Sequence, residues 1–426
     1  MIKQVTIWLL FAATLLILPE IFDSLLAISI FNQMAIMIVF ALSYNMLLGQ
    51  GGMLSFGHAV YFGLGGFLAV HVLRMVEYES IMMSTTLVPL VGGVFGLLAA
   101  IFIGSFSTRK AGTVFAMISL GIGELIAASS LILVSFFGGE AGISGDRTFG
   151  PPLFGIEFTQ DLHIYYLGAV WMFVSVLLMY LFTKTPAGRM ANAVRDNPER
   201  AEFIGYSTRK VRFISFCAAG LFAGIAGGLF AVSYEIVTEE NLNAVTSGRV
   251  LLMAYIGGLG FFIGPIIGAI VLTLVNSVLS NYTELWMLYL GIMFVLTVMF
   301  LPRGLAGFLM MHRLPWHLGK TRLLIRPYVL TAIPASIFLL SLIAMLEMAH
   351  SSAAEFVYLG ITFNPSGSGS WIIVAALTVA SFFALRRTLP QLRAAWAAAN
   401  TQPAIKPSAP ADVSAPLNPS LKESSN

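Results

Sequence analysis

Cysteine and charge are scarce in this sequence of 426 residues. The single cysteine, Cys217, excludes an intrachain disulfide and a cluster of thiolates around a metal ion. Asp, Glu, Lys and Arg together make up only 10% of the residues, whereas they make up roughly a quarter of a soluble globular domain. The composition therefore excludes an ordinary soluble protein. The net charge of +3 is too small to indicate binding to nucleic acid.

Motifs for catalysis are also missing. The six histidines form no metal-spaced cluster, and no Ser-His-acid arrangement is recognisable. The segment His-Leu-Gly-Lys-Thr at 317–321 ends like a phosphate-binding P-loop, but Leu314 stands where the first glycine belongs. We therefore expect no catalytic residues, no metal site and no cofactor in this chain.

Long apolar runs dominate what is present. Hydrophobic residues make up 58% of the sequence, and the mean hydropathy is +0.88. Crossing about 30 Å of hydrocarbon takes about 20 apolar residues in a helix, which satisfies its own backbone hydrogen bonds there. The sequence thus predicts an all-α, polytopic membrane protein with about 10–12 transmembrane helices. Candidate spans are 5–22, 26–48, 54–73, 87–106, 113–137, 163–183, 211–234, 249–262, 264–282, 285–302, 327–349 and 371–386.

The distribution of charge between these spans predicts their orientation. With the N-terminus inside, 20 of the 23 Lys and Arg residues fall on cytoplasmic segments. The exceptions are Arg74, Arg147 and Arg249. The first apolar run ends at Pro19 without a small-residue cleavage site, so we expect a retained helix and not a signal peptide. We predict a multi-pass protein with a cytoplasmic N-terminus.

Segment 184–212 is a polar island among the apolar runs. It holds seven Lys or Arg and three acidic residues. Asn197 followed by Pro198 is typical of a helix cap and a first helical position, and Gly205 would close this short helix. Short helices beside the bilayer suit the docking of a cytoplasmic partner. The alternative is a solvated loop that only attracts anionic lipid headgroups.

Two glycine-rich segments, 48–67 and 254–269, interrupt the apolar runs. One interpretation is a pair of broken or re-entrant helices whose free backbone groups meet a polar substrate. The alternative is that the glycines only allow tight helix packing. Under the first interpretation the candidate pathway residues are Ser55, Gly57, His58, Gly257, Gly258, Gly260 and Gly264.

Glu124 is an acidic residue inside the apolar span 113–137. A carboxylate in the middle of a membrane costs at least about 2.5 kcal/mol unless it faces a cavity or a partner. Glu124 is therefore a further pathway candidate. The alternative is a structural role in which it pairs with a nearby group such as Ser119.

Four motifs, in order along residues 30–308, resemble the permease subunits of branched-chain (hydrophobic) amino acid ABC importers, and the M-type subunit most closely. The run RDNPERAE at 195–202, with Gly205, resembles the coupling loop of that family. The other motifs are LSYNMLLGQGGMLSFGHAVYFGLGGF at 42–67, FAMISLGIGE at 115–124 with GGEAGI at 138–143, and the glycine-rich run at 257–268.

The resemblance implies a set of partners. A homologous second permease would complete a heterodimer, a periplasmic substrate-binding protein would deliver branched-chain amino acids, and two cytoplasmic ATPase subunits would bind ATP and Mg²⁺. Urea and short amides are alternative substrates in this family. The implied location is the bacterial inner membrane. The coupling residues implied by the motif are Arg195, Asp196, Asn197, Pro198, Glu199, Ala201 and Gly205.

The resemblance ends near residue 309, so we predict three parts. They are a permease transmembrane domain at 1–308, an appended basic loop and two-helix hairpin at 309–387, and a disordered Ala/Pro/Ser-rich cytoplasmic tail at 388–426. Two rival functions stay open. One is an ion- or proton-coupled secondary transporter that uses Glu124 as its coupling carboxylate. The other is a membrane-embedded assembly subunit.

Overall fold

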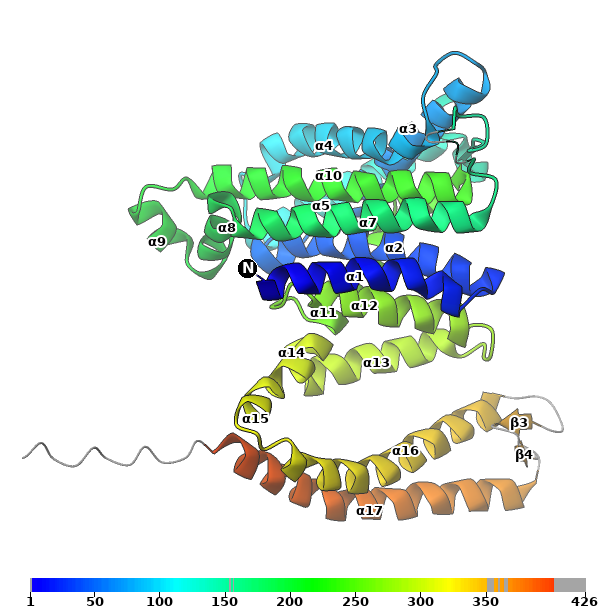
Figure 1. Ribbon diagram of the computed structural model, residues 1–426, viewed down its shortest axis with the longest axis vertical. Coiled ribbons are helices and arrows are strands. Elements are labelled where there is room, and N and C mark those ends of the chain that lie inside the picture. The colour runs from blue at the N-terminus through cyan, green and yellow to red at the C-terminus, as the bar shows by residue number, and fades with distance from the viewer. Residues whose placement is uncertain are drawn as a thin grey trace, which may run out of the picture. The chain divides into compact units, whose positions relative to one another are not determined.

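The computed structural model describes residues 2–152, 155, 157–350, 356–358, 361–363 and 367–401 (Figure 1). The described residues are mostly helical, and the chain divides into two compact units, Met1–Met310 and Met311–Asn426. The longer helices of the first unit are α1 (Ile2–Ile21), α2 (Leu25–Asn45), α3 (Ala59–Glu77), α4 (Val88–Ser107), α5 (Gly112–Ile132), α7 (Asp161–Lys184), α10 (Thr208–Tyr234), α11 (Ala244–Gly257), α12 (Gly264–Leu274) and α13 (Trp286–Phe300).

Short elements connect these helices. They are α6 (Val134–Phe137), α8 (Pro186–Asp196), α9 (Pro198–Phe203), α14 (Gly304–Met311), the π-helical turns Met46–Gln50 and Val275–Leu279, and the 3₁₀ turns Thr85–Leu87, Gly139–Ala141 and Glu239–Asn241. Strands β1 (Ile143–Ser144) and β2 (Ile236–Val237) form an antiparallel pair in which Ile143 lies opposite Val237.

The apolar composition of the helices confirms the prediction of an all-α, polytopic membrane protein. Within the described residues, eight helices are long and apolar enough to cross a membrane, or up to nine if the bent pair Trp286–Phe300 and Gly304–His317 is one span. Three apolar helices are shorter, namely Val5–Ile21, Ala244–Gly257 and Gly264–Leu279. Each of the twelve predicted spans therefore contains an apolar helix, but α11 and α12 are too short for full crossings because the chain breaks between them.

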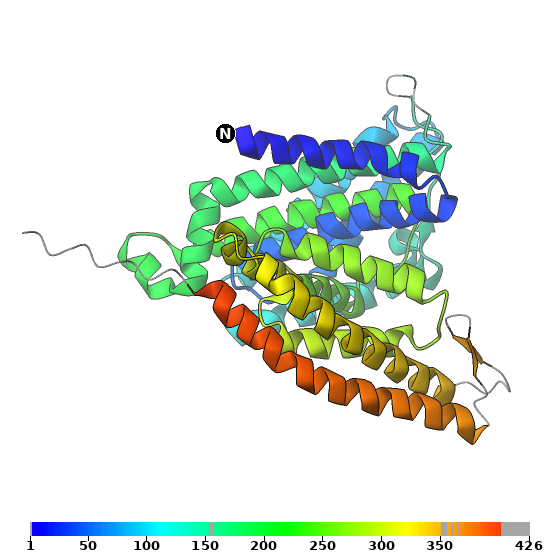
Figure 2. The same ribbon diagram turned by 60° about the horizontal axis from the view of Figure 1, so that its bottom comes forward.

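Helix α10 is the centre of the first unit, where it packs along α4 and α3 (Figures 1 and 2). Glycines make this packing close. A Cβ atom at Gly224 would lie 2.2 Å from the carbonyl oxygen of Gly92, and one at Gly227 would lie 1.8 Å from that of Phe62. Helices in lipid associate through such close van der Waals packing because the surrounding lipid is as apolar as their side chains.

The second unit is built on a helical hairpin. It contains α15 (Arg313–His317), α16 (Arg322–His350), β3 (Phe356–Tyr358), β4 (Ile361–Phe363) and α17 (Ser368–Asn400). Helices α16 and α17 pack along each other, and β3 pairs with β4 in antiparallel register. Near the start of the hairpin, the Tyr328 hydroxyl lies 2.7 Å from His312 Nε2 and accepts a hydrogen bond from Trp396 Nε1 at 3.0 Å.

Helix α17 extends beyond the residue at which the sequence predicts the tail to begin. Residues 388–400 belong to this helix and not to a disordered segment. The reason is local, because the stretch from Ala394 to Ala399 is nearly all alanine, the strongest helix former. The remainder of the predicted tail, residues 402–426, lies outside the described residues.

We predict that Gly224→Ala destabilises the first unit by about 1–3 kcal/mol, the usual cost of overpacking. The added methyl group would meet the backbone of α4, which cannot rotate away as a side chain can. Gly248→Ala in α11 is the matched control, because a Cβ atom there meets nothing within 4 Å. Thermal unfolding of the two purified variants measures the difference. Equal melting temperatures would show that α4 and α10 do not need this contact.

Candidate functional site

The polar island folds into two short helices, α8 and α9. The Thr185 hydroxyl accepts a hydrogen bond from the Gly188 N–H at 3.2 Å and thereby caps the start of α8. Asn197 ends α8 and caps α9, because its Oδ1 accepts from the Arg200 N–H at 2.9 Å. Gly205 follows α9 with φ +89°. The predicted punctuation of this segment by Asn197, Pro198 and Gly205 agrees with this geometry.

A small apolar cluster holds the two helices against α10. Ala191 and Val194 from α8, Ala201 from α9 and Val211 from α10 are buried together. Thr208 Oγ1 also donates to Glu202 Oε1 at 2.7 Å, which ties α9 to the first turn of α10. Ala201 therefore has a packing role. By contrast, Asp196, Pro198 and Glu199 are exposed on the surface.

Large apolar side chains are exposed at the end of this polar segment. Phe203 is 89% exposed, Ile204 is 62% exposed and Tyr206 is 43% exposed. They follow one another around the turn that contains Gly205. We name residues 185–206 the knob, and these three side chains its apolar tip. An exposed apolar patch rimmed by polar residues marks a surface that contacts a protein partner or the membrane.

Arg195 connects the knob to the first glycine-rich segment. Its Nη1 donates to the carbonyl oxygen of Gly49, and its Nε donates to Asp196 Oδ1 at 2.9 Å. Gly52 has φ +66°, and a Cβ atom there would lie 2.7 Å from Arg195 Cγ. The side chain of Arg195 thus packs against Gly49 and Gly52, where the helical region that begins with α2 ends.

The first glycine-rich segment is a buried break between α2 and α3. Residues 51–58 are not helical, yet Ser55 and His58 are each only 1% exposed. His58 Nε2 lies 2.9 Å from Ser43 Oγ, and the His58 ring stacks on Phe40 with 5.6 Å between centroids. The Tyr44 hydroxyl donates to the Ser55 carbonyl at 3.0 Å. Helix α2 therefore supplies one wall of the break.

Serine hydroxyls from two other helices accept hydrogen bonds from backbone N–H groups of this break. Ser119 Oγ in α5 accepts from the Phe56 N–H at 3.1 Å. Ser247 Oγ in α11 accepts from the Ala59 N–H at 2.9 Å. Gly57 packs directly on α5, since a Cβ atom at Gly57 would lie 2.1 Å from the Ser119 carbonyl oxygen. These hydroxyls accept hydrogen bonds from N–H groups that would bond to carbonyl oxygens of the same helix if the helix were uninterrupted.

The second glycine-rich segment turns α11 into α12 and packs them tightly. Gly258 has φ +110°, and a Cβ atom at Gly257 would lie 1.9 Å from the Gly264 carbonyl oxygen. A Cβ atom at Gly260, however, would meet nothing within 4 Å. The two glycine-rich segments also lie against each other, since a Cβ atom at Gly49 would lie 2.7 Å from the carbonyl oxygen of Leu259. Tight packing, the alternative interpretation, accounts for Gly257, Gly258 and Gly264.

Glu124 lies on the exposed face of α5, away from the break. Ser119, the partner considered above, donates to the Ala116 carbonyl at 2.8 Å and accepts from Phe56. Among the described residues, Glu124 has no hydrogen bond or ion pair. The structure therefore does not bring Glu124 together with Ser55, Gly57 and His58, and its role in a pathway stays a prediction.

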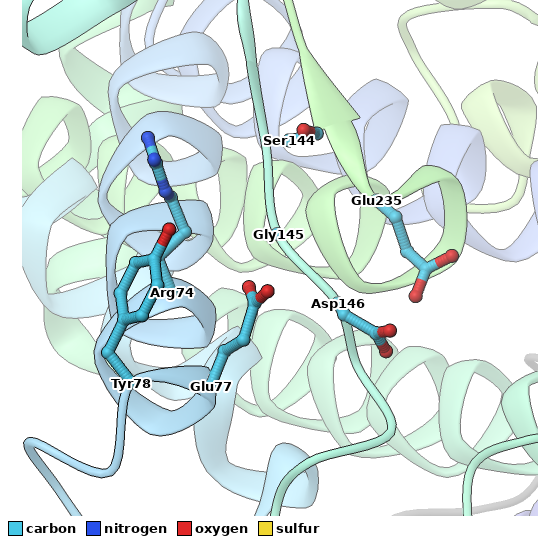
Figure 3. A pocket seen from close by; sticks show the side chains of 7 residues that line it. All are labelled: Arg74, Glu77, Tyr78, Ser144, Gly145, Asp146 and Glu235. Atoms are coloured by element: carbon cyan, nitrogen blue, oxygen red, sulfur yellow. The ribbon is translucent and has the colours of Figure 1, made fainter.

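The other end of the first unit carries a polar hollow of about 300 Å³ (Figure 3). Helix α7 joins this end to the knob, and its 24 residues span about 36 Å. Figure 3 shows the carboxylates of Glu77, Asp146 and Glu235 around the hollow, with Arg74 on α3. Next to it, Arg147 donates to Asp161 Oδ1 at 3.0 Å and fixes this loop to α7.

Sequence reasoning missed the serines that hold the break and the apolar tip of the knob. Ser119 and Ser247 lie far from residues 55–59 in sequence, and a serine in an apolar helix gives no local signal of its partner. Phe203 and Ile204 were detectable, since two large apolar residues stand in a segment otherwise rich in charge.

A helical membrane bundle with a buried break lined by polar groups is the construction of membrane transport proteins. A family described as branched-chain amino acid transport system, permease component, matches residues 26–298. The chain belongs to this family, which confirms the resemblance found in the motifs.

Individual relatives agree with this assignment. Over 293 residues the chain is 25% identical to the high-affinity branched-chain amino acid transport system permease protein LivM of Escherichia coli, with 63% of this chain and 67% of that protein covered. It is 22% identical to the corresponding permease protein LivH of Salmonella typhimurium, with 63% and 90% covered. It is 30% identical to the autoinducer 2 import system permease protein LsrC of Photorhabdus laumondii, with 27% and 36% covered. No solved structure matches the chain.

We predict that Ser119→Ala and Ser247→Ala each destabilise the protein by about 1–2 kcal/mol, because each leaves a backbone N–H of the break without an acceptor. Ser129→Ala, also in α5, is the control, since the Ser129 hydroxyl bonds only to the Leu125 carbonyl of its own helix. Thermal unfolding of the purified variants provides the comparison. If Ser129→Ala costs as much as the other two, the hydroxyls do not anchor the break.

Proposed function

We propose that this chain is one of two permease subunits of an ATP-driven importer of branched-chain amino acids. The family is one of transport permease components, and the observation that carries the proposal is the knob. A secondary transporter needs no surface for a soluble ATPase. A knob with capped helices and an exposed apolar tip is such a surface.

The knob suits a cytoplasmic ATPase because it combines rigidity with an apolar contact. The caps at Thr185 and Asn197 satisfy backbone groups that an unanchored loop would leave to water. Phe203 and Ile204 supply the kind of side chain that forms the buried centre of a protein interface. The knob also holds all seven coupling residues implied by the family motif. Their role in coupling is part of this proposal.

Arg195 is the proposed link between ATPase movement and the pathway. A displacement of α8 pulls on the Gly49 carbonyl through the guanidinium. The turn Met46–Gln50 leads straight into the break with Ser55 and His58, so the displacement reaches the segment held by Ser119 and Ser247. Movement of the break relative to α5 and α11 is the proposed step that opens the pathway.

The second permease subunit is proposed to cover the outer face of α5. Glu124 and Leu125 are exposed on this face, and a Cβ atom at Gly121 would meet nothing within 4 Å. A carboxylate exposed in the middle of an apolar helix is costly in lipid. A protein partner or the water-filled pathway between two subunits removes that cost.

The acidic hollow at the other end is the proposed contact for a periplasmic binding protein. Positive charge gathers at the knob end, so the knob is the cytoplasmic side under the positive-inside rule. The beginning of α1 lies at the same end as α8 and α9 (Figures 1 and 2), so the proposed orientation has the N-terminus in the cytoplasm as well. Glu77, Asp146 and Glu235 then face the compartment from which substrate arrives.

We predict that Phe203→Ser with Ile204→Ser lowers co-purification of the ATPase about tenfold or more. Each side chain contributes about 1.5–3 kcal/mol when it is buried at an interface. The substitutions leave the buried cluster of Ala191, Ala201 and Val211 intact, so the protein stays folded in the membrane. Pull-down of the ATPase and uptake of labelled leucine in vesicles measure the effect.

Lys210→Ala is the control for this experiment, because Lys210 is exposed in the same polar island but is not part of the apolar tip. Unchanged co-purification of the ATPase in the double variant would contradict docking at the tip. Uptake that persists without ATP would favour the secondary transporter instead.

We also predict that Arg195→Ala separates ATPase binding from transport. The apolar tip is unchanged, so the ATPase still co-purifies, whereas leucine uptake falls about tenfold or more with loss of a hydrogen bond to a charged group. Arg189→Ala is the control, since Arg189 is exposed on the same helix and its side chain makes no hydrogen bond within the described residues. Equal uptake by both variants would remove Arg195 from the coupling route.

A further inference from the structure

A cavity of about 210 Å³ lies between α2, α11, α12 and α13. It shares no residue with the knob or with the buried break. Pockets for drug-sized ligands are roughly 300–1,000 Å³, so this cavity suits a smaller molecule or one end of a longer one. Its wall is mostly apolar and includes Met37, Leu252, Met253, Leu272, Trp286 and Leu290.

The polar residues of the wall are Gln33, Arg249, Thr273 and Asn276. The Ser277 hydroxyl donates to Gln33 Oε1 at 2.7 Å, which leaves the amide N–H₂ of Gln33 as a donor. Thr273 is 2% exposed, and its hydroxyl has no partner among the described residues. Buried polar groups are normally hydrogen-bonded, so a hydroxyl left unpaired in a cavity wall indicates a missing partner.

Arg249 supplies the charge of this cavity. It lies in the second turn of α11, and within the described part of the chain its guanidinium has no ion pair or hydrogen bond. The lining residues that the structure describes include no carboxylate. Arg249 is exposed, and the side chains beside it in the cavity wall are mostly apolar. A bound anion would pair with its charge.

The exposed residues of the cavity rim are Arg249 and two apolar residues, Val245 and Met287. Val245 and Met287 both belong to the lining, and each is 64% exposed. Apolar residues at the surface of a membrane helix bundle give access to aliphatic chains. The cavity therefore combines one positive charge, a few donors and an apolar approach.

We propose that this cavity binds an aliphatic molecule through one phosphate or carboxylate group. The guanidinium of Arg249 offers a fork of N–H donors that fits a phosphate or a carboxylate. The aliphatic part lies against Leu272, Leu290 and the other apolar side chains of the wall. One source is an anionic phospholipid of the surrounding bilayer. The other is the transported amino acid, and only this source rests on the proposed transport function.

The test compares Arg249→Gln and Arg249→Lys with the wild type. The full-length chain is purified with the subunits that accompany it and placed in nanodiscs of phosphatidylcholine with a small fraction of phosphatidylglycerol. Native mass spectrometry measures retained phosphatidylglycerol, and equilibrium dialysis measures binding of labelled leucine. We expect Arg249→Gln to weaken one of the two about tenfold or more, and Arg249→Lys to weaken it less. Arg109→Gln, at an exposed arginine outside this cavity, is the control.

The two measurements distinguish the two sources. Loss of phosphatidylglycerol alone identifies a lipid site, and loss of leucine alone identifies a substrate site. If neither ligand is lost, or if Arg109→Gln causes an equal loss, the proposal is overturned. Because the cavity shares no residue with the knob, failure of ATPase docking leaves the lipid measurement unaffected.

Discussion

The structure depends on one constraint, which is that every backbone N–H and C=O inside a bilayer needs a partner within the protein. Between α2 and α3 the chain is not helical although it is buried, and backbone N–H groups there form hydrogen bonds with side chains of other helices. Ser119 and Ser247 accept from the N–H groups of Phe56 and Ala59. The break thereby fixes α2, α5 and α11 relative to one another.

The knob contacts the start of this break through the side chain of Arg195. Arg195 belongs to α8, yet its guanidinium bonds to the carbonyl of Gly49 and its stem packs on Gly52. The positive φ of Gly52 and the missing Cβ atom make room for that stem. A rigid short helix and a charged hydrogen bond transmit a displacement better than a flexible loop does, because little of the motion is absorbed by changes of conformation.

Sequence reasoning reached the elements whose signals are local. Apolar runs predict the membrane helices, and Asn197 with Pro198 predicts the start of α9. It could not reach contacts between residues distant in sequence, such as Ser247 with Ala59. The end of α17 was predicted too early in the sequence. The prolines and serines in 401–426 suggested disorder from residue 388 onwards, whereas the alanines just before them favour a helix.

The glycine-rich segments divide into glycines that the packing requires and one that it does not. Gly57 and Gly257 lie against backbone atoms, so packing alone explains them, whereas Gly260 has open space around it. The polar pathway candidates do not come together in this chain. Ser55 and His58 are buried, whereas Glu124 is exposed on the outer face of α5. A costly carboxylate on an outer face supports the proposal that a second subunit completes the pathway, and that this chain supplies one side of it.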